Sequence, residues 1–161
     1  MTAALAALRP APAPGIRLVD PREMHLTLHF RGAADITETV YALRTVAPPR
    51  FSLQISGVGR FVPREGDIPL WASVADSPAL TGLHQAVGAA LSNRQWRVDA
   101  RAFIPHVTLA WCTRAVPQAV IDGFLARGPD LGALEVPVEA FTLYAGTEGP
   151  SYNFVRRFPL R

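Results

Sequence analysis

The sequence predicts an α+β fold in one domain, residues 1–161, made of two lobes of mainly antiparallel sheet with outer helices. Two observations support this prediction. Apolar residues make up 49% of the chain and charged residues 18%, a balance typical of a folded domain with a substantial core. Each half of the chain runs as strand, helix and hairpin-like strands, which indicates two pseudo-symmetric lobes.

Alternating and helical patterns define the elements of the first half. The prolines of "APAPG" end an Ala-rich first helix, Pro21 separates two alternating segments, and a turn-rich "PREGDIP" separates two more. The expected elements are a helix within 1–10, strands over 16–20 and 24–30, a helix over 34–46, and a hairpin over 50–61 and 70–76.

The second half repeats these patterns. Ser77 is a plausible N-cap for a helix with Pro78 at its first position, and one face of that helix carries Leu80, Leu83, Val87 and Leu91. The expected elements are this helix over 77–93, a strand over 106–112, a helix over 117–128, and strands over 133–146 and 151–160.

Composition excludes several function classes. All sixteen basic residues are arginine, so lysine chemistry is absent, and the net charge of +3 fits an anionic partner. The single cysteine, Cys112, cannot form an internal disulfide and is expected to be a small buried hydrophobe. Without a long apolar run, a secretory signal, a Gly-rich nucleotide loop or metal-ligand spacing, we expect a cytoplasmic monomer that uses no metal or other cofactor.

Two of the four histidines lie in the same pattern of His, apolar, Thr, apolar. The first copy is "HLTL" at 25–28 and the second is "HVTL" at 106–109. Alternation along a strand points His25 and Thr27 to one face, and His106 and Thr108 likewise. If the two halves face each other, the two polar pairs meet in one cleft.

Such a site suits phosphodiester chemistry. Histidine, with an ordinary pKa of about 6.5, serves as acid or base near neutral pH. One imidazole can accept a proton from water while the other donates a proton to the leaving oxygen, and threonine hydroxyls can hold the phosphate oxygens. This chemistry requires no metal, and a strained cyclic phosphate is its easiest substrate. The residues alone do not distinguish the acid from the base.

Three segments resemble the RNA 2',3'-cyclic phosphodiesterases, also called 2'-5' RNA ligases, of the two-histidine (2H) phosphoesterase superfamily. "EMHLTLHFRG" resembles the first motif of these enzymes, "RAFIPHVTLAW" the second, and "GPSYNFVRRFPL" the closing strand, so the resemblance covers about residues 16–161. It implies a bilobal 2H phosphoesterase-like catalytic domain with a central cleft. It also implies that His25 is the proton donor, that His106 is the proton acceptor, and that Thr27 and Thr108 bind the phosphate.

The implied reaction opens the cyclic phosphate at an RNA 3' end, or that of a small nucleotide, to a 2'-phosphate. Reversible 2'-5' RNA ligation and non-catalytic binding of RNA 3' ends are the alternatives. The chain departs from the family pattern in two places. Few residues precede Ile16, so we expect one lobe to lack an edge strand, and Trp111 stands where many members carry a basic residue.

Some other side chains are candidates for RNA contacts. A phosphate could be met by one of four arginines, and since Arg156 and Arg157 point to opposite faces of a strand, at most one of the two can face the cleft. His29 could line the cleft, whereas His84 is expected to be a surface residue. Aromatic rings can stack on nucleobases. The arginine candidates are Arg31, Arg101, Arg114 and Arg156, and the aromatic candidates are Phe30, Phe61, Phe103 and Tyr152.

Overall fold

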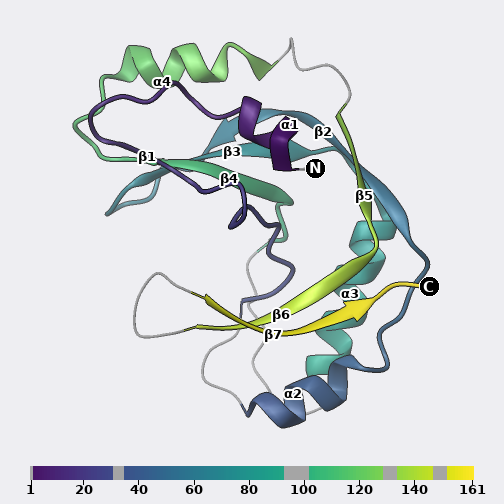
Figure 1. Cartoon of the computed structure of the whole chain (residues 1–161). Helices are drawn as coiled ribbons and strands as arrows, with labels where there is room; N and C mark the ends of the chain where they lie inside the picture. The colour runs from purple at the N-terminus through teal and green to yellow at the C-terminus, as the bar shows by residue number, and fades with distance from the viewer. Residues whose placement is uncertain (1, 31–34, 93–101, 129–133, 147–151) are drawn as a thin grey trace. The chain divides into compact units, whose positions relative to one another are not determined.

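The computed structural model describes residues 2–30, 35–92, 102–128, 134–146 and 152–161. It confirms the α+β class and the division into two compact units (Figure 1). Neither unit corresponds to one half of the sequence. The first unit comprises Met1–Thr27, Leu53–Asp76 and Ile104–Val136, and the second comprises Leu28–Ser52, Ser77–Phe103 and Pro137–Arg161.

The first unit is built on a five-stranded sheet with the strand order β1-β4-β3-β2-β5. The pairs β1–β4, β4–β3 and β3–β2 are antiparallel. The strands are β1 (Ile16–Leu18), β2 (Phe51–Arg60), β3 (Ile68–Val74), β4 (His106–Cys112) and β5 (Leu134–Val138), and the helices are α1 (Thr2–Ala7) and α4 (Gln118–Leu125). One face of the central strands is buried and carries Leu70, Ala72, Val107, Ala110 and Cys112. Burial raises the pKa of the Cys112 thiol, with Asp67 as a smaller cause.

The second unit packs two helices with a two-stranded antiparallel sheet. Its elements are α2 (Ile36–Leu43), α3 (Pro78–Ser92), β6 (Ala140–Gly146) and β7 (Tyr152–Pro159). The hydrophobic core joins all four elements and consists of Leu43, Val46, Leu83, Val87, Leu91, Phe141, Phe158 and Leu160. No helix within the described residues is long and apolar enough to cross a membrane.

Side-chain caps explain where α2 and α3 begin. The Asp35 carboxylate accepts a hydrogen bond from the Glu38 backbone N–H at 2.8 Å. The Ser77 hydroxyl accepts one from the Leu80 N–H at 3.2 Å, which confirms the predicted cap. The four apolar positions predicted to share one face of α3 are all buried.

The prediction of a full strand over 24–30 is wrong, since the segment forms a single bridge, between Leu26 and Val107. The edge of β4 on this side is already occupied by β1 as far as Leu109, whose carbonyl accepts from the Val19 N–H at 2.9 Å. After Thr27 the chain passes into the second unit. Little of β4 is therefore left for this segment to pair with.

The predicted single strand over 133–146 is two strands in different sheets. It breaks at Glu139, with β5 in the larger sheet and β6 paired with β7. The Glu139 carbonyl accepts from the Leu160 N–H at 2.8 Å, which holds the break beside the end of β7. Alternation predicts that a segment is extended, but it does not identify the strand with which the segment pairs.

Candidate active site

The two His-x-Thr motifs lie side by side in the first unit. Leu26 of the first motif forms an antiparallel bridge with Val107 of the second. Residues on either side of a bridge point away from the face that the bridging residues occupy. Since Val107 is buried, at 6% exposure, this alternation places the His and Thr of both motifs on the opposite, more open face.

The prediction that each motif belongs to its own half-chain lobe is wrong. Both motifs belong to the first unit, because the segment 1–27 returns along the edge of β4 rather than remaining with the rest of the first half. The two motifs run antiparallel, so that His25 lies beside Thr108 and Thr27 beside His106. Each histidine therefore has the threonine of the other motif as a cross-strand neighbour.

The two imidazoles are held in the same way. Nδ1 of His25 donates to the Glu23 carbonyl at 2.6 Å, and Nδ1 of His106 donates to the Ile104 carbonyl at 2.7 Å. A carbonyl oxygen only accepts, so these bonds fix the proton on Nδ1 in both rings. In the neutral form of each ring, Nε2 is therefore the nitrogen that carries no proton.

Two aromatic rings flank the His106 imidazole. Phe61 meets it edge-on with 4.9 Å between ring centroids, and Trp71 lies at 5.9 Å. Phe61 and Trp71 also contact each other, at 5.1 Å. This packing restricts rotation of the imidazole and shields part of it from water. Phe61, one of the four aromatic candidates for base stacking, thus contacts a motif histidine.

The Trp71 indole lies across Gly59, its partner on β2. A Cβ on Gly59 would come within 2.2 Å of the indole Cη2, much closer than a carbon–carbon contact allows. The indole Nε1 is buried and, among the described residues, has no hydrogen-bond partner. The absence of a side chain at Gly59 therefore determines where the ring beside His106 lies.

We expect Gly59→Ala to displace Trp71 and to disturb His106. Overpacking of this kind costs about 1–3 kcal/mol of stability. Urea denaturation would measure the loss, and tryptophan fluorescence would report the displaced indole. Gly82→Ala is a matched control, because a Cβ there meets nothing within 4 Å and alanine favours a helix. Equal stability of the Gly59→Ala variant and the wild-type protein would contradict the expectation.

A bulge in β4 brings Trp111 to the same face as the motif residues. His106, Thr108 and Trp111 lie opposite Ser73, Trp71 and Pro69, which alternate along β3 and so share one face. The shift in register at Leu70/Trp71 skips Leu109 and makes this possible.

Arg17 of β1 reaches the same face of the sheet, the motif face. It lies opposite Trp111, and its guanidinium carbon is 5.8 Å from the centroid of the Trp111 ring. Sequence reasoning missed Arg17, because finding it required the pairing of β1 with β4 and the position of the bulge. A cation thus lies over the tryptophan that stands where many members of the resembled family carry a basic residue.

The structure describes two of the four arginines predicted to meet phosphate, Arg114 and Arg156. Arg114 donates to the carbonyls of Pro63 and Arg64 at 2.6 and 2.8 Å, so that it holds the loop between β2 and β3. Arg156 belongs to the second unit. The remaining two candidates, Arg31 and Arg101, lie outside the described residues.

His29 and His84 form a separate cluster in the second unit. The His84 ring stacks on His29 at 4.1 Å and on Phe103 at 3.9 Å, and the His29 Nε2–H donates to the His84 carbonyl at 2.7 Å. Burial, and secondarily the charge of His29, lowers the pKa of His84. His84 is thus half-buried, in contact with two rings, and the prediction of a surface histidine is correct only in part. Phe30 and Tyr152 are exposed.

The fold and the paired motifs define a two-histidine phosphoesterase. A family model described as the 2'-5' RNA ligase superfamily matches residues 2–150. The chain belongs to this superfamily.

Similar proteins agree with this assignment. An RNA 2',3'-cyclic phosphodiesterase of Thermus thermophilus is 30% identical, over 93% of this chain and 78% of the relative. The crystal structure of TT0787, also of T. thermophilus, matches with a TM-score of 0.76 and 26% identity, covering 99% of this chain and 91% of that one. E. coli LigT complexed with 3'-AMP shares the fold, with a TM-score of 0.68, 21% identity, and coverage of 92% and 83%.

Proposed function

We propose that this protein hydrolyses the 2',3'-cyclic phosphate at RNA 3' ends to a 2'-phosphate, without a metal, with His25 as proton donor and His106 as proton acceptor. The observation that carries the proposal is the bridge between Leu26 and Val107, which brings two identical His-x-Thr motifs together on one face. The matching Nδ1 bonds of the two imidazoles and the names of the relatives support it.

In the proposed reaction, water attacks the phosphorus while Nε2 of His106 accepts its proton. The bond from phosphorus to the ribose 3' oxygen breaks, and Nε2 of His25 donates a proton to that oxygen. The hydroxyls of Thr27 and Thr108 donate hydrogen bonds to the non-bridging oxygens as their charge grows. The products are a 2'-phosphate and a 3'-hydroxyl. Both units, residues 1–161, act as one catalytic domain in a monomer.

The test uses a short RNA that ends in a 2',3'-cyclic phosphate, incubated with the protein in EDTA. The expected product carries a 2'-phosphate, which resists an enzyme selective for 3'-phosphates. A 3'-phosphate product would mean that the 2' oxygen leaves. An unchanged cyclic end, with folded protein, would contradict the proposal. Joining of an added RNA bearing a 5'-hydroxyl would instead indicate ligation.

Arg17 is proposed to bind a phosphate oxygen at this site, because its guanidinium reaches the motif face over Trp111. We expect Arg17→Gln to lower kcat/KM by about 10- to 100-fold, the value of a lost charge-assisted hydrogen bond. Trp111→Leu should have a smaller effect, since it removes only the ring under the guanidinium.

Arg60→Gln is the control for Arg17. Arg60 is the cross-strand partner of Leu70, which lies on the face of the sheet opposite to Trp71 and the motif residues. Arg60 therefore lies on that opposite face as well, and it donates to the Gln118 side chain at 3.1 Å. An equal loss of kcat/KM in Arg17→Gln and Arg60→Gln would mean that only the net charge of the protein matters, and would refute phosphate binding by Arg17.

A further inference from the structure

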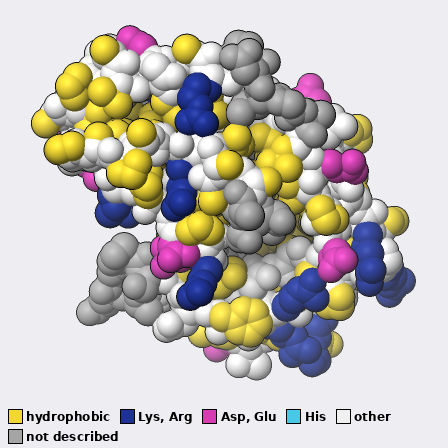
Figure 2. Space-filling model, turned by 45° about the horizontal axis from the view of Figure 1, so that its top comes forward, with side chains coloured by type: hydrophobic (Ala, Val, Ile, Leu, Met, Phe, Trp, Pro, Cys, Tyr) yellow, Lys and Arg dark blue, Asp and Glu magenta, His cyan; other side chains and the backbone are white. Residues whose placement is uncertain are grey.

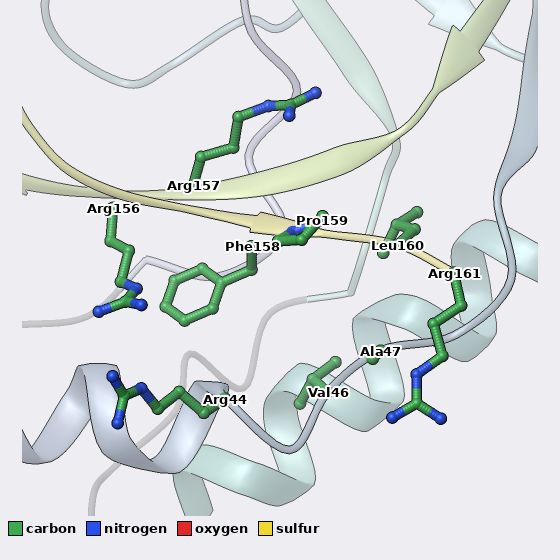
Figure 3. Close-up of a pocket in the computed structure, with 9 residues that line it drawn as sticks. All are labelled: Arg44, Val46, Ala47, Arg156, Arg157, Phe158, Pro159, Leu160 and Arg161. Carbon is green, nitrogen blue, oxygen red and sulfur yellow. The ribbon is translucent and has the colours of Figure 1, made fainter.

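Two arginines of the second unit line the same pocket. Neither belongs to either His-x-Thr motif. Arg44 is the C-cap residue of α2, and Arg156 lies on β7. Both line a pocket of about 290 Å³ and also the adjoining one. Figure 3 shows the Arg156 side chain extending from β7 toward Arg44.

The register of β7 explains the direction of Arg156. Arg156 pairs with Leu143 and Phe158 with Phe141, so these residues share the face that packs on the core. The Arg156 guanidinium carbon lies 6.0 Å from the centroid of the buried Phe158 ring. Arg157 points to the other side of the strand, where it pairs with Glu139 at 3.6 Å (Figure 3).

No carboxylate balances the converging arginines. Among the described residues, neither Arg44 nor Arg156 forms an ion pair, and no Asp or Glu lines either pocket. Arg157 and Arg161 also line the first pocket, and the backbone of Arg161 is held by hydrogen bonds to Pro48 and Arg50. Since the chain has no lysine, every blue side chain in Figure 2 is an arginine.

Like charges held together weaken a fold unless an anion lies between them. Guanidinium groups match phosphate in shape and donate two hydrogen bonds in parallel. Apolar and aromatic side chains line the two pockets as well, among them Phe158 in the first and Val40 and Tyr41 in the second, so the surface offers charge together with apolar contact. The combination suits a nucleic-acid strand better than a free anion.

We propose that Arg44 and Arg156 bind a backbone phosphodiester of the RNA strand other than the reacting cyclic phosphate. The inference rests on the proposed function for the identity of the RNA, but the binding itself does not require turnover. The site adds affinity for a polynucleotide and leaves the chemical step unchanged. It therefore distinguishes RNA ends from small cyclic nucleotides.

The first experiment measures binding of a labelled single-stranded RNA with a 3'-hydroxyl end by fluorescence anisotropy. We expect the double variant Arg44→Gln/Arg156→Gln to weaken binding by about 5- to 50-fold. The slope of log Kd against log salt concentration should fall by about 0.7 for each lost phosphate contact. Thermal unfolding of both proteins establishes that the variant folds, and Arg44→Lys/Arg156→Lys, which keeps the charge, should restore part of the affinity.

Arg157→Gln is the matched control, because it removes the same charge from the neighbouring residue. Arg157 also borders the first pocket, but its guanidinium points to the opposite side of β7, where it pairs with Glu139 (Figure 3). It should leave the Kd within about twofold of the wild-type value. A larger loss in Arg157→Gln than in the double variant would mean that RNA follows the other face of β7, and would overturn the proposal. Unchanged binding in the double variant would overturn it too.

The second experiment separates this inference from the proposed function. For RNA with a cyclic phosphate end, the double variant should raise KM by about the same factor as Kd and leave kcat unchanged. For 2',3'-cyclic AMP, kcat/KM should not change. An equal loss of kcat/KM on both substrates would overturn the RNA site. If neither substrate turns over even with the wild-type protein, the proposed function fails, while the anisotropy result still decides the site. If millimolar inorganic phosphate by itself displaced the labelled RNA in the anisotropy measurement, the site would be one for free phosphate instead.

Discussion

Replacement of either motif histidine, His25→Ala or His106→Ala, is expected to lower kcat/KM by about 10²- to 10⁴-fold, the contribution of one general acid or base. The physical reason is that, in the proposed reaction, each imidazole moves one proton in the transition state. The Nδ1 bonds to the Glu23 and Ile104 carbonyls leave Nε2 of each ring for the proposed proton transfer. Steady-state kinetics on RNA with a cyclic phosphate end measures the loss.

The pH profile identifies the role of each histidine. A base must be deprotonated and an acid protonated, so the wild-type protein should give a bell-shaped kcat/KM curve. His106→Ala should lose the fall at low pH, and His25→Ala the fall at high pH. A phosphodiester with a 4-nitrophenolate leaving group, which departs without protonation, should recover much of the activity of His25→Ala only. Recovery in His106→Ala instead would reverse the two roles.

His84→Ala is the control for these variants, since it removes an imidazole that lies outside both motifs and in the second unit. Its kcat/KM should stay within a few-fold of the wild-type value once unfolding temperatures show that it is folded. Activity that survives both motif replacements would refute the assignment of the site.

The second large effect is expected at the threonines. Thr27→Val and Thr108→Val should each lower kcat by about 10- to 10³-fold, up to the loss found when a donor to a developing oxyanion is removed. Valine keeps the branched shape and the preference for extended structure, so the change removes little more than the hydroxyl. Rapid-quench single-turnover kinetics would measure the chemical step directly.

Thr27→Ser and Thr108→Ser are the matched variants, because they keep the hydroxyl and remove only a methyl group. They should retain most of the activity. Activity in the valine variants that equals that of the serine variants would exclude phosphate binding by the hydroxyls, and would leave the threonines a purely structural role.

The helices were predictable from local signals. The Ser77 cap and the four apolar positions of α3 were correct, because a cap and a helical face depend on residues only a few positions apart. The predicted strand over 24–30 and the undivided strand over 133–146 were wrong. Strand pairing depends on which distant segment occupies the neighbouring edge, and the sequence around a strand does not contain that information.

The sequence by itself determined the chemical groups of the chain and its fold class: two His-x-Thr motifs, no lysine, one cysteine and the α+β class. Alternation predicted that the His and Thr of each motif share one face where the backbone is extended. Only the tertiary structure decided that both motifs lie in one unit, that Leu26 meets Val107, and that the bulge at Leu109 places Trp111 and Arg17 on the motif face. Long-range hydrogen bonding sets register, and a one-residue shift in register moves every following side chain to the other face.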